Sequence, residues 1–193
     1  MALGDRFDDV LSAARSGAEW AWAELYAEFA PGLLRFIAGL GAAEPEDCLG
    51  ECFLQIVRNL PGFVGEEASF RAWTYLLARN RVVDSWRGAG RRPLPSEEVV
   101  AVAERRRQDE AADAALTRRD AVEQILATLT PDQRAVVILR VLDQFSAEET
   151  AAILGRSPGS VRVLQHRAIK ALRDAVAPVG GNRGRDRLPA EGP

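Results

Sequence analysis

The sequence predicts an all-α protein with two small helical domains joined by a flexible linker. Alanine, leucine, arginine and glutamate dominate its 193 residues, while β-branched and aromatic residues cluster only locally, which favours helix over sheet. Apolar residues recur at helical spacing in two long stretches, and glycine, proline and mixed charge separate those stretches. We therefore predict domains at residues 1–90 and 114–177, a linker at 91–113 and a disordered tail at 178–193.

The first domain is predicted to be a compact bundle of three or four helices. Its clearest apolar stripe lies within residues 25–37, where large apolar side chains recur every three or four positions. Breaks in the helical pattern are expected at Pro31, at residues 39–45 and at residues 61–65, because glycine and proline gather there.

The second domain carries three predicted helix starts. Residues 130–133 and 146–149 each supply an N-cap hydroxyl and a residue three positions later that can close a capping box. Ser157 and Pro158 open the last helix, and Gly155 can adopt the left-handed conformation that ends the helix before it. Helices at 147–154 and 159–173 then have the length and turn chemistry of a helix-turn-helix.

Composition narrows the class of function. The net charge of −3 does not indicate a polyanionic partner, so a nucleic-acid surface has to be local, as in the basic stretches 79–92 and 156–173. No apolar run is long enough to cross a bilayer, which predicts a cytoplasmic protein without membrane insertion. The sequence has one histidine and no glycine-rich phosphate loop. We therefore predict that the protein is not an enzyme, has no catalytic residues and binds no cofactor.

The two cysteines, Cys48 and Cys52, lie one helical turn apart and admit two interpretations. Their spacing is compatible with metal binding or redox chemistry. The other interpretation is a pair of buried reduced thiols, which we favour because the only histidine, His166, is far away in the sequence. We therefore assign no metal site.

The last helix is predicted to present a basic surface that fits the major groove of DNA. If Val161, Leu164, Ala168 and Leu172 face the core, the outward surface is basic and without acids. The residues assigned to this surface are Ser157, Ser160, Arg162, Val163, His166, Arg167 and Lys170. The alternative is a helical hairpin whose arginines are merely solvated.

The helix predicted at 69–86 carries polar residues that continue an apolar stripe. One interpretation is a structural network in which Asp84 bonds Arg87 or Arg81, and the other is that Asn80 and its neighbours meet an extruded base. The loop before this helix places Phe63 where it can line a pocket, and Tyr75 is a candidate for base stacking. The candidate residues are Phe63, Tyr75, Arg79, Asn80, Asp84 and Arg87.

The helix predicted at 46–59 places apolar residues, including Val57, toward the interior. Its outward residues are predicted to be Glu46, Asp47, Gly50, Glu51, Gln55 and Arg58. The acids at its start either face a protein partner or simply complement the helix dipole.

Two groups of motifs resemble the extracytoplasmic-function sigma factors, members of the sigma-70 family of bacterial RNA polymerase. The group that resembles their second conserved region consists of Pro45–Leu54, Phe70–Asn80, Asp84 and Arg87. The group that resembles their fourth region consists of Gln133–Arg134, Glu148–Ala151 and Ser157–Arg162.

The resemblance implies a transcription initiation factor that binds core RNA polymerase and promoter DNA. By resemblance, helix 46–59 docks on the clamp helices of the largest subunit, and the flap is a further polymerase contact. The loop after it and helix 69–86 recognise and open the minus-ten element, and helix 159–173 recognises the minus-thirty-five element. The resemblance also implies an anti-sigma protein as a partner.

Two departures from the family pattern affect what is carried over. Gly50 stands where glutamine is commoner, and Val163, Leu164 and Gln165 replace the more usual serine, basic residue and leucine. The family's typical promoter sequence is therefore not transferred to this chain. The principal alternative function is a helix-turn-helix regulator that binds its operator without joining polymerase.

Overall fold

The computed structural model describes residues 3–88 and 126–176, and all regular elements in these two ranges are helical. The first range contains η1 (Gly4–Arg6), α1 (Phe7–Arg15), α2 (Glu19–Leu40), α3 (Pro45–Asn59), η2 (Leu60–Gly62) and α4 (Glu67–Gly88). The second contains α7 (Pro131–Val137), the π-helix η3 (Ile138–Leu142), α8 (Ala147–Leu154) and α9 (Pro158–Val176). The predicted all-α architecture is confirmed for these residues. The linker predicted at 91–113 and the tail at 178–193 lie outside them.

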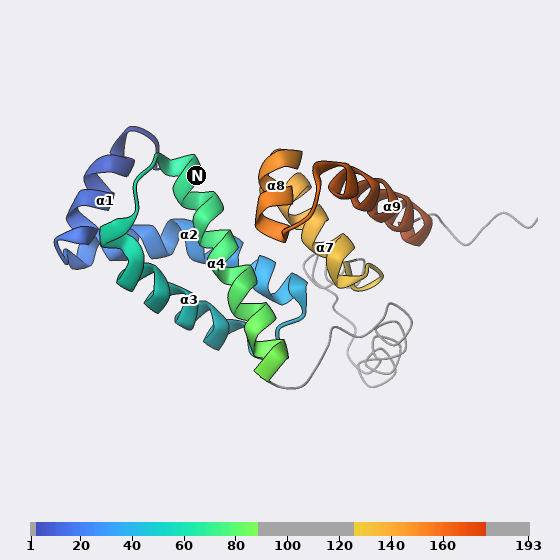
Figure 1. Ribbon diagram of the computed structural model, residues 1–193, viewed down its shortest axis with the longest axis horizontal. Helices are drawn as coiled ribbons and strands as arrows, with labels where there is room; N and C mark the ends of the chain where they lie inside the picture. The colour runs from blue at the N-terminus through green and yellow to red at the C-terminus, as the bar shows by residue number, and fades with distance from the viewer. Residues whose placement is uncertain (1–2, 89–125, 177–193) are drawn as a thin grey trace, which may run out of the picture.

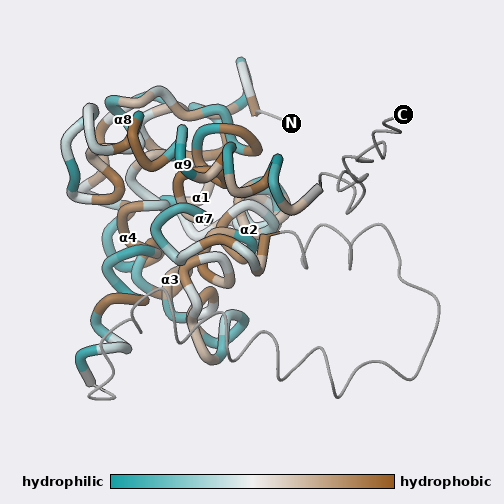
Figure 2. Tube along the Cα trace, turned by 90° about the vertical axis from the view of Figure 1, so that its right-hand side faces the viewer, coloured by the Kyte–Doolittle hydropathy of each residue, from teal (hydrophilic) through white to brown (hydrophobic). Residues whose placement is uncertain are grey.

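The first domain packs α1, α3 and α4 against the long helix α2 (Figure 1). Its centre is aromatic: the ring of Phe70 lies 5.5 Å from that of Phe7 and 5.2 Å from that of Phe29, centroid to centroid. Aromatic pairs at this spacing add to the stabilisation that burial already provides. In Figure 2, hydrophobic and hydrophilic segments alternate along the helices, as the helical periodicity of the sequence requires.

The predicted break at Pro31 is wrong, because α2 continues through this residue to Leu40. Proline removes one backbone hydrogen bond and strains the preceding turn. Buried residues nevertheless lie on both sides of it, among them Phe29 and Leu33, and α2 contacts α1, α3 and α4. Burial of both halves of the helix against the bundle outweighs the local cost of the proline. The other two breaks are confirmed, with Gly41 left-handed at φ 87° and a 3-10 turn at Leu60–Gly62.

The helices of the second domain begin where their capping residues predict. Both capping boxes are present: Thr130 accepts from the Gln133 amide, Ser146 accepts from the Glu149 amide, and each later side chain returns the bond. Gly155 ends α8 at φ 62°, the left-handed conformation predicted for it. The helix-turn-helix formed by α8 and α9 is therefore specified locally, by residues next to its own turns.

The two domains pack against each other in the part of the chain that the structure describes. α8 lies along α4, and α7 and η3 contact α2 (Figure 1). One continuous apolar cluster includes Phe36 of the first domain and Ile138 and Phe145 of the second. The sequence predicts the two domains but not this contact between them.

Candidate nucleic-acid and polymerase interfaces

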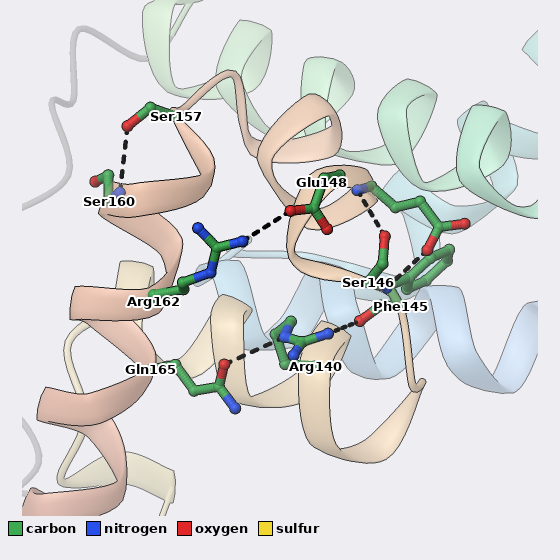
Figure 3. A network of polar contacts seen from close by, with 9 residues as sticks. Arg140, Phe145, Ser146, Glu148, Ser157, Ser160, Arg162 and Gln165 are labelled. Atoms are coloured by element: carbon green, nitrogen blue, oxygen red, sulfur yellow. Dashed lines mark hydrogen bonds and ion pairs between the residues drawn. The ribbon is translucent and has the colours of Figure 1, made fainter.

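Helix α9 turns the predicted residues outward. Val161 and Ala168 are fully buried, and Leu164 and Leu172 are half-buried, so the predicted core face is confirmed. Ser160 is half-buried, and the exposed residues of the predicted surface are Ser157, Arg162, Val163, His166, Arg167 and Lys170. The Ser160 amide donates to Ser157 Oγ at 3.2 Å, which caps the start of this helix (Figure 3).

One acid reaches the predicted basic surface from the neighbouring helix. Arg162 Nη2 lies 2.9 Å from Glu148 Oε1 of α8 (Figure 3). The expectation of a surface without acids therefore holds for the outward residues of α9 but not for the whole helix-turn-helix. Because both side chains are more than 60% exposed, water screens this pair, and it contributes little stability. In the structure the Arg162 guanidinium is turned toward Glu148 of α8.

Arg140, which sequence analysis did not identify, ties η3 to the candidate recognition helix. Its Nε donates to Gln165 Oε1 of α9 at 3.2 Å, and its Nη1 donates to the carbonyl of Phe145 (Figure 3). Arg140 is half-buried, so these bonds replace part of its hydration. No local pattern marks Arg140, because its partners lie 5 and 25 positions away.

The loop before α4 is anchored rather than open. The ring of Phe63 lies 5.3 Å from that of Phe70 and 5.1 Å from that of Trp73, and its carbonyl accepts a bond from Arg15. Phe63 and Trp73 are both half-buried. Phe63 thus closes one end of the aromatic core and keeps one side accessible.

Tyr75 lies in the contact between the two domains. It is 2% exposed, and its hydroxyl donates to Asp143 Oδ2 at 3.0 Å. Burial and the negative charge of Asp143 raise the pKa of Tyr75 well above its usual range, so the hydroxyl remains a donor at neutral pH. In this arrangement of the domains, Tyr75 is not accessible to stack on a base, contrary to what its candidate role requires.

The polar end of α4 is exposed. Asn80, Asp84 and Arg87 face solvent, and Arg79 is half-buried. Asp84 pairs with Arg87 at 3.3 Å, whereas Arg81 pairs with Glu51 of α3. The Asp84–Arg87 bond expected for a structural network is therefore present, while Asn80 stays accessible and receives only a long 3.4 Å bond from Arg79.

The outward face of α3 is acidic with an apolar strip. Five of the six predicted residues are exposed, and Gln55 is half-buried. Val57 was predicted to face inward but is 46% exposed, and Leu54 beside it is 56% exposed. The reason is helical geometry: Leu49, Cys52, Ile56 and Leu60 form the buried stripe, and Val57 is rotated about 100° from Ile56.

Cys48 and Cys52 are buried free thiols, as the favoured interpretation predicts. A hydrogen bond with Cys48, together with burial, raises the pKa of the Cys52 thiol. Within the described residues, no group of three or more potential ligands could hold a metal ion. None of the helices described is both long and apolar enough to cross a membrane.

Comparison with known proteins matches both domains. The family models for Sigma-70 region 2 and for Sigma-70, region 4 match residues 25–92 and 119–172. Together with the fold, these matches define the two-domain architecture of the sigma-70 class.

Whole-chain relatives identify the subfamily. The ECF RNA polymerase sigma factor SigD of Mycobacterium tuberculosis is 34% identical over 187 residues, which cover 92% of this chain and 87% of the relative. RNA polymerase sigma factor CarQ of Myxococcus xanthus is 32% identical, with 84% of this chain and 92% of the relative covered. The chain belongs to the extracytoplasmic-function sigma factors.

Solved structures support the same fold. CnrH, in complex with the cytosolic domain of CnrY, is similar with a TM-score of 0.59 at 24% identity, covering 89% of this chain and 97% of that chain. The sigma factor RpoE of Bartonella quintana, in complex with the anti-sigma factor NepR, is similar with a TM-score of 0.58 at 22% identity. The match covers 79% of this chain and 94% of that chain.

Family membership establishes the general function. The chain is a sigma factor that binds RNA polymerase and directs transcription initiation, and the alternative of a regulator acting without polymerase is set aside. Its family acts on RNA polymerase in the cytoplasm and is not a family of enzymes.

The two capping boxes should respond differently to acid. The bonds from Ser146 hold the pKa of Glu149 below its usual 4.5, so its stabilisation is complete above pH 4.5 and is lost as pH falls through the lower folded-state pKa. We expect the cost of Glu149→Ala in unfolding free energy to shrink in acid. In the capping box of α7 the same bond is made by the neutral side chain of Gln133. The loss of unfolding free energy caused by Gln133→Ala should therefore not depend on pH. Denaturant titrations from pH 3 to 7 measure both, and parallel profiles would contradict this assignment.

Proposed function

We propose that this sigma factor recognises its promoter through two surfaces, one on α9 and one on α4, and binds core polymerase through α3. The observation that carries the proposal is the outward side of α9, whose cations are exposed while the opposite side is buried in the domain. Exposed arginines on a helix-turn-helix are suited to phosphate contacts and to guanine edges. The protein would act in the cytoplasm, without catalytic residues, metal or cofactor of its own.

The α9 surface is proposed to recognise the minus-thirty-five element. Arg162, Arg167 and Lys170 supply positive charge for the phosphates or for base acceptors. Ser157, Ser160 and His166 add polar contacts near the start and middle of the helix. Val163 is 50% exposed and cannot donate a hydrogen bond through its side chain, so its natural partner in the major groove is the methyl group of thymine.

The α4 surface is proposed to recognise and open the minus-ten element. Asn80 offers amide donors and acceptors to an extruded base, and Arg79 and Arg87 supply charge near the strand. Asp84 forms an exposed ion pair with Arg87. Phe63 and Tyr75 are the proposed aromatic contacts, and Tyr75 becomes available only if the two domains separate.

The α3 surface is proposed to dock on the clamp helices of the polymerase largest subunit. It combines exposed acids with the apolar pair Leu54 and Val57. Exposure of these two side chains to water is unfavourable, and a protein partner would bury them. The other residues proposed for this surface are Glu46, Asp47, Gly50, Glu51, Gln55 and Arg58. The second domain is proposed to contact the flap.

An anti-sigma protein is a further proposed partner. Two similar solved structures are complexes with a second protein: CnrH is bound to the cytosolic domain of CnrY, and the sigma factor RpoE is bound to the anti-sigma factor NepR. A regulator that covers both α3 and the α4 surface would block polymerase and promoter at once.

In-vitro transcription with core polymerase and a genomic promoter library tests the function directly. Adding the purified chain should direct initiation to a limited set of start sites that core polymerase alone does not use. Start sites indistinguishable from those of core polymerase alone would refute the proposal.

The double variant Leu54→Ser/Val57→Ser, which keeps every charge of the α3 surface, should lose polymerase binding but keep its fold.

Replacing Arg162 or Arg167 with alanine should weaken promoter binding and flatten its dependence on salt. Each lost phosphate contact reduces the slope of log affinity against log salt by about 0.9. Arg6→Ala is the matched control, because Arg6 is an exposed arginine at the end of η1, paired with Glu24 and distant in the chain from both DNA surfaces. Fluorescence anisotropy of the holoenzyme on promoter DNA between 50 and 200 mM salt measures the slope. Equal slopes for all three variants and wild type would exclude phosphate contacts by Arg162 and Arg167.

The role of Val163 can be isolated by changing the DNA alone. Replacing thymine with deoxyuridine removes only the C5-methyl group, so one position of the minus-thirty-five element should lose about 0.8 kcal/mol, roughly a fourfold change in affinity. Val163→Ala should remove the sensitivity to that exchange while leaving binding to the deoxyuridine promoter nearly unchanged. If wild type binds both promoters equally at every position, Val163 contacts no thymine methyl.

A further inference from the structure

The loop that precedes α4 is held at both ends by the N-terminal segment of the chain. This loop, residues 60–66, connects α3 to α4 and runs beside α1 (Figure 1). Arg15, the last residue of α1, donates to the loop, and the amides of Leu3 and Gly4 donate to Glu67, the first residue of α4. The partners lie 45 to 64 positions apart, so no local pattern in the sequence reveals these bonds.

Arg15 joins the beginning of the loop to its middle. Its Nε donates to the carbonyl of Leu60 at 3.4 Å, and its Nη2 donates to the carbonyl of Phe63. The amide of Phe63 donates to the same Leu60 carbonyl at 3.1 Å, which closes the 3-10 turn between the two contacts. Because the donors of a guanidinium form a rigid fork, Arg15 fixes the spacing of these two backbone carbonyls.

Glu67 fixes the other end of the loop. Its Oε1 accepts from the Leu3 amide at 2.7 Å, and its Oε2 accepts from the Gly4 amide at 2.8 Å. Leu3 has right-handed backbone angles and Gly4 a left-handed φ of 57°, and successive amides in this arrangement converge on one anion. Glycine adopts that φ at little cost. We call Arg15, Glu67 and the two amides the N-terminal clasp.

Between these anchors, the loop presents one apolar side chain to solvent. Val64 is 92% exposed, whereas Phe63 before it packs on the rings of Phe70 and Trp73. Gly65 after it lies so close to Phe63 that a Cβ would be 3.1 Å from Cζ of that ring. Both neighbours of Val64 are thus held in place although Val64 itself adds nothing to the core. The N-terminal clasp orders a segment whose outward side is available to a ligand.

We propose that Arg15 and Glu67 are positioning residues, which hold the loop 60–66 in the conformation that receives an extruded base of the minus-ten element. The proposal rests on the proposed role of this loop and α4. A base that leaves the duplex loses its stacking, and the protein has to replace that stacking with contacts of its own. A loop that became ordered only on binding would subtract its conformational entropy from those contacts. The N-terminal clasp places that cost in folding, before DNA arrives.

Base discrimination by the holoenzyme tests the positioning role. The probes are single-stranded oligonucleotides with the minus-ten element of a promoter mapped by in-vitro transcription, in which each position is changed to every other base. The readout is the ratio of affinities for the best and worst base at the most selective position, because a ratio is insensitive to the fraction of protein that is folded. We expect Arg15→Ala to lower this ratio by about threefold or more, since it removes two hydrogen bonds with a charged donor. Arg15→Lys, which keeps the charge and can still donate, should restore part of it.

Arg6→Ala is again the matched control, because Arg6 belongs to the same N-terminal segment but pairs with Glu24. It should keep the wild-type ratio, and all variants should keep wild-type affinity for core polymerase. Equal ratios for Arg15→Ala and wild type overturn the positioning role alone. If wild type prefers no base at any position, the proposed role of the loop and α4 fails, and the positioning role fails with it.

Hydrogen exchange in the free full-length chain provides a second measurement. Arg15→Ala should speed amide exchange in the loop 60–66, and Glu67→Gln should do the same because it replaces one acceptor oxygen with a donor. Arg6→Ala should leave the exchange of the loop unchanged. Exchange in Arg15→Ala as slow as in wild type would mean that the loop is ordered without Arg15, and faster exchange with unchanged base discrimination would mean that its order is irrelevant to the base. Either result overturns the proposal.

Discussion

A carboxylate removed from water has to be paired, and Asp143 finds its partners only on the other domain. Because Arg35 and Tyr75 approach it from two different helices, both helices have to be correctly placed before the charge is satisfied. This constraint determines how the helix-turn-helix meets the α2–α4 side of the first domain. Two glycines of α2 fit the same close approach of the domains: each costs about 1 kcal/mol relative to alanine within a helix, and a Cβ would lie 2.4 Å from the Tyr75 hydroxyl at Gly32 and 2.3 Å from Cδ1 of Ile138 at Gly39.

The features that the sequence predicts correctly are those decided by neighbours in the chain. The capping boxes at Thr130 and Ser146 and the left-handed Gly155 depend on residues within four positions, and all three are present. The error at Pro31 arose because tertiary burial overrides a local preference. Tyr75 could not be placed from sequence, because its burial depends on a residue 68 positions away. The outward face of α9 was predictable because the buried residues of a helix define its opposite side.

The positions of the charged residues, rather than the net charge, determine which partners the surfaces of this protein suit. With a net charge of −3, the chain as a whole has no attraction for DNA. The exposed cations of α9 make one surface attractive, while Glu148 of α8 offsets the charge of one of them, Arg162. The acids of α3 lie on a different helix, beside Leu54 and Val57, where they suit a protein partner better than a nucleic acid. Opposite charges in one small protein can therefore be directed to two different partners.

Phe145 connects the domain contact to the candidate recognition helix. Its ring lies against Arg71 of the first domain, and its carbonyl accepts a bond from Arg140, which also holds Gln165 of α9. The next residue, Ser146, is the N-cap of α8. A movement of the loop Asp143–Phe145 would therefore act on the start of α8 and, through Arg140, on α9. A contiguous set of contacts of this kind can carry coupling between two sites if it has two discrete arrangements. The loop that covers Tyr75 is part of the domain that carries the α9 surface.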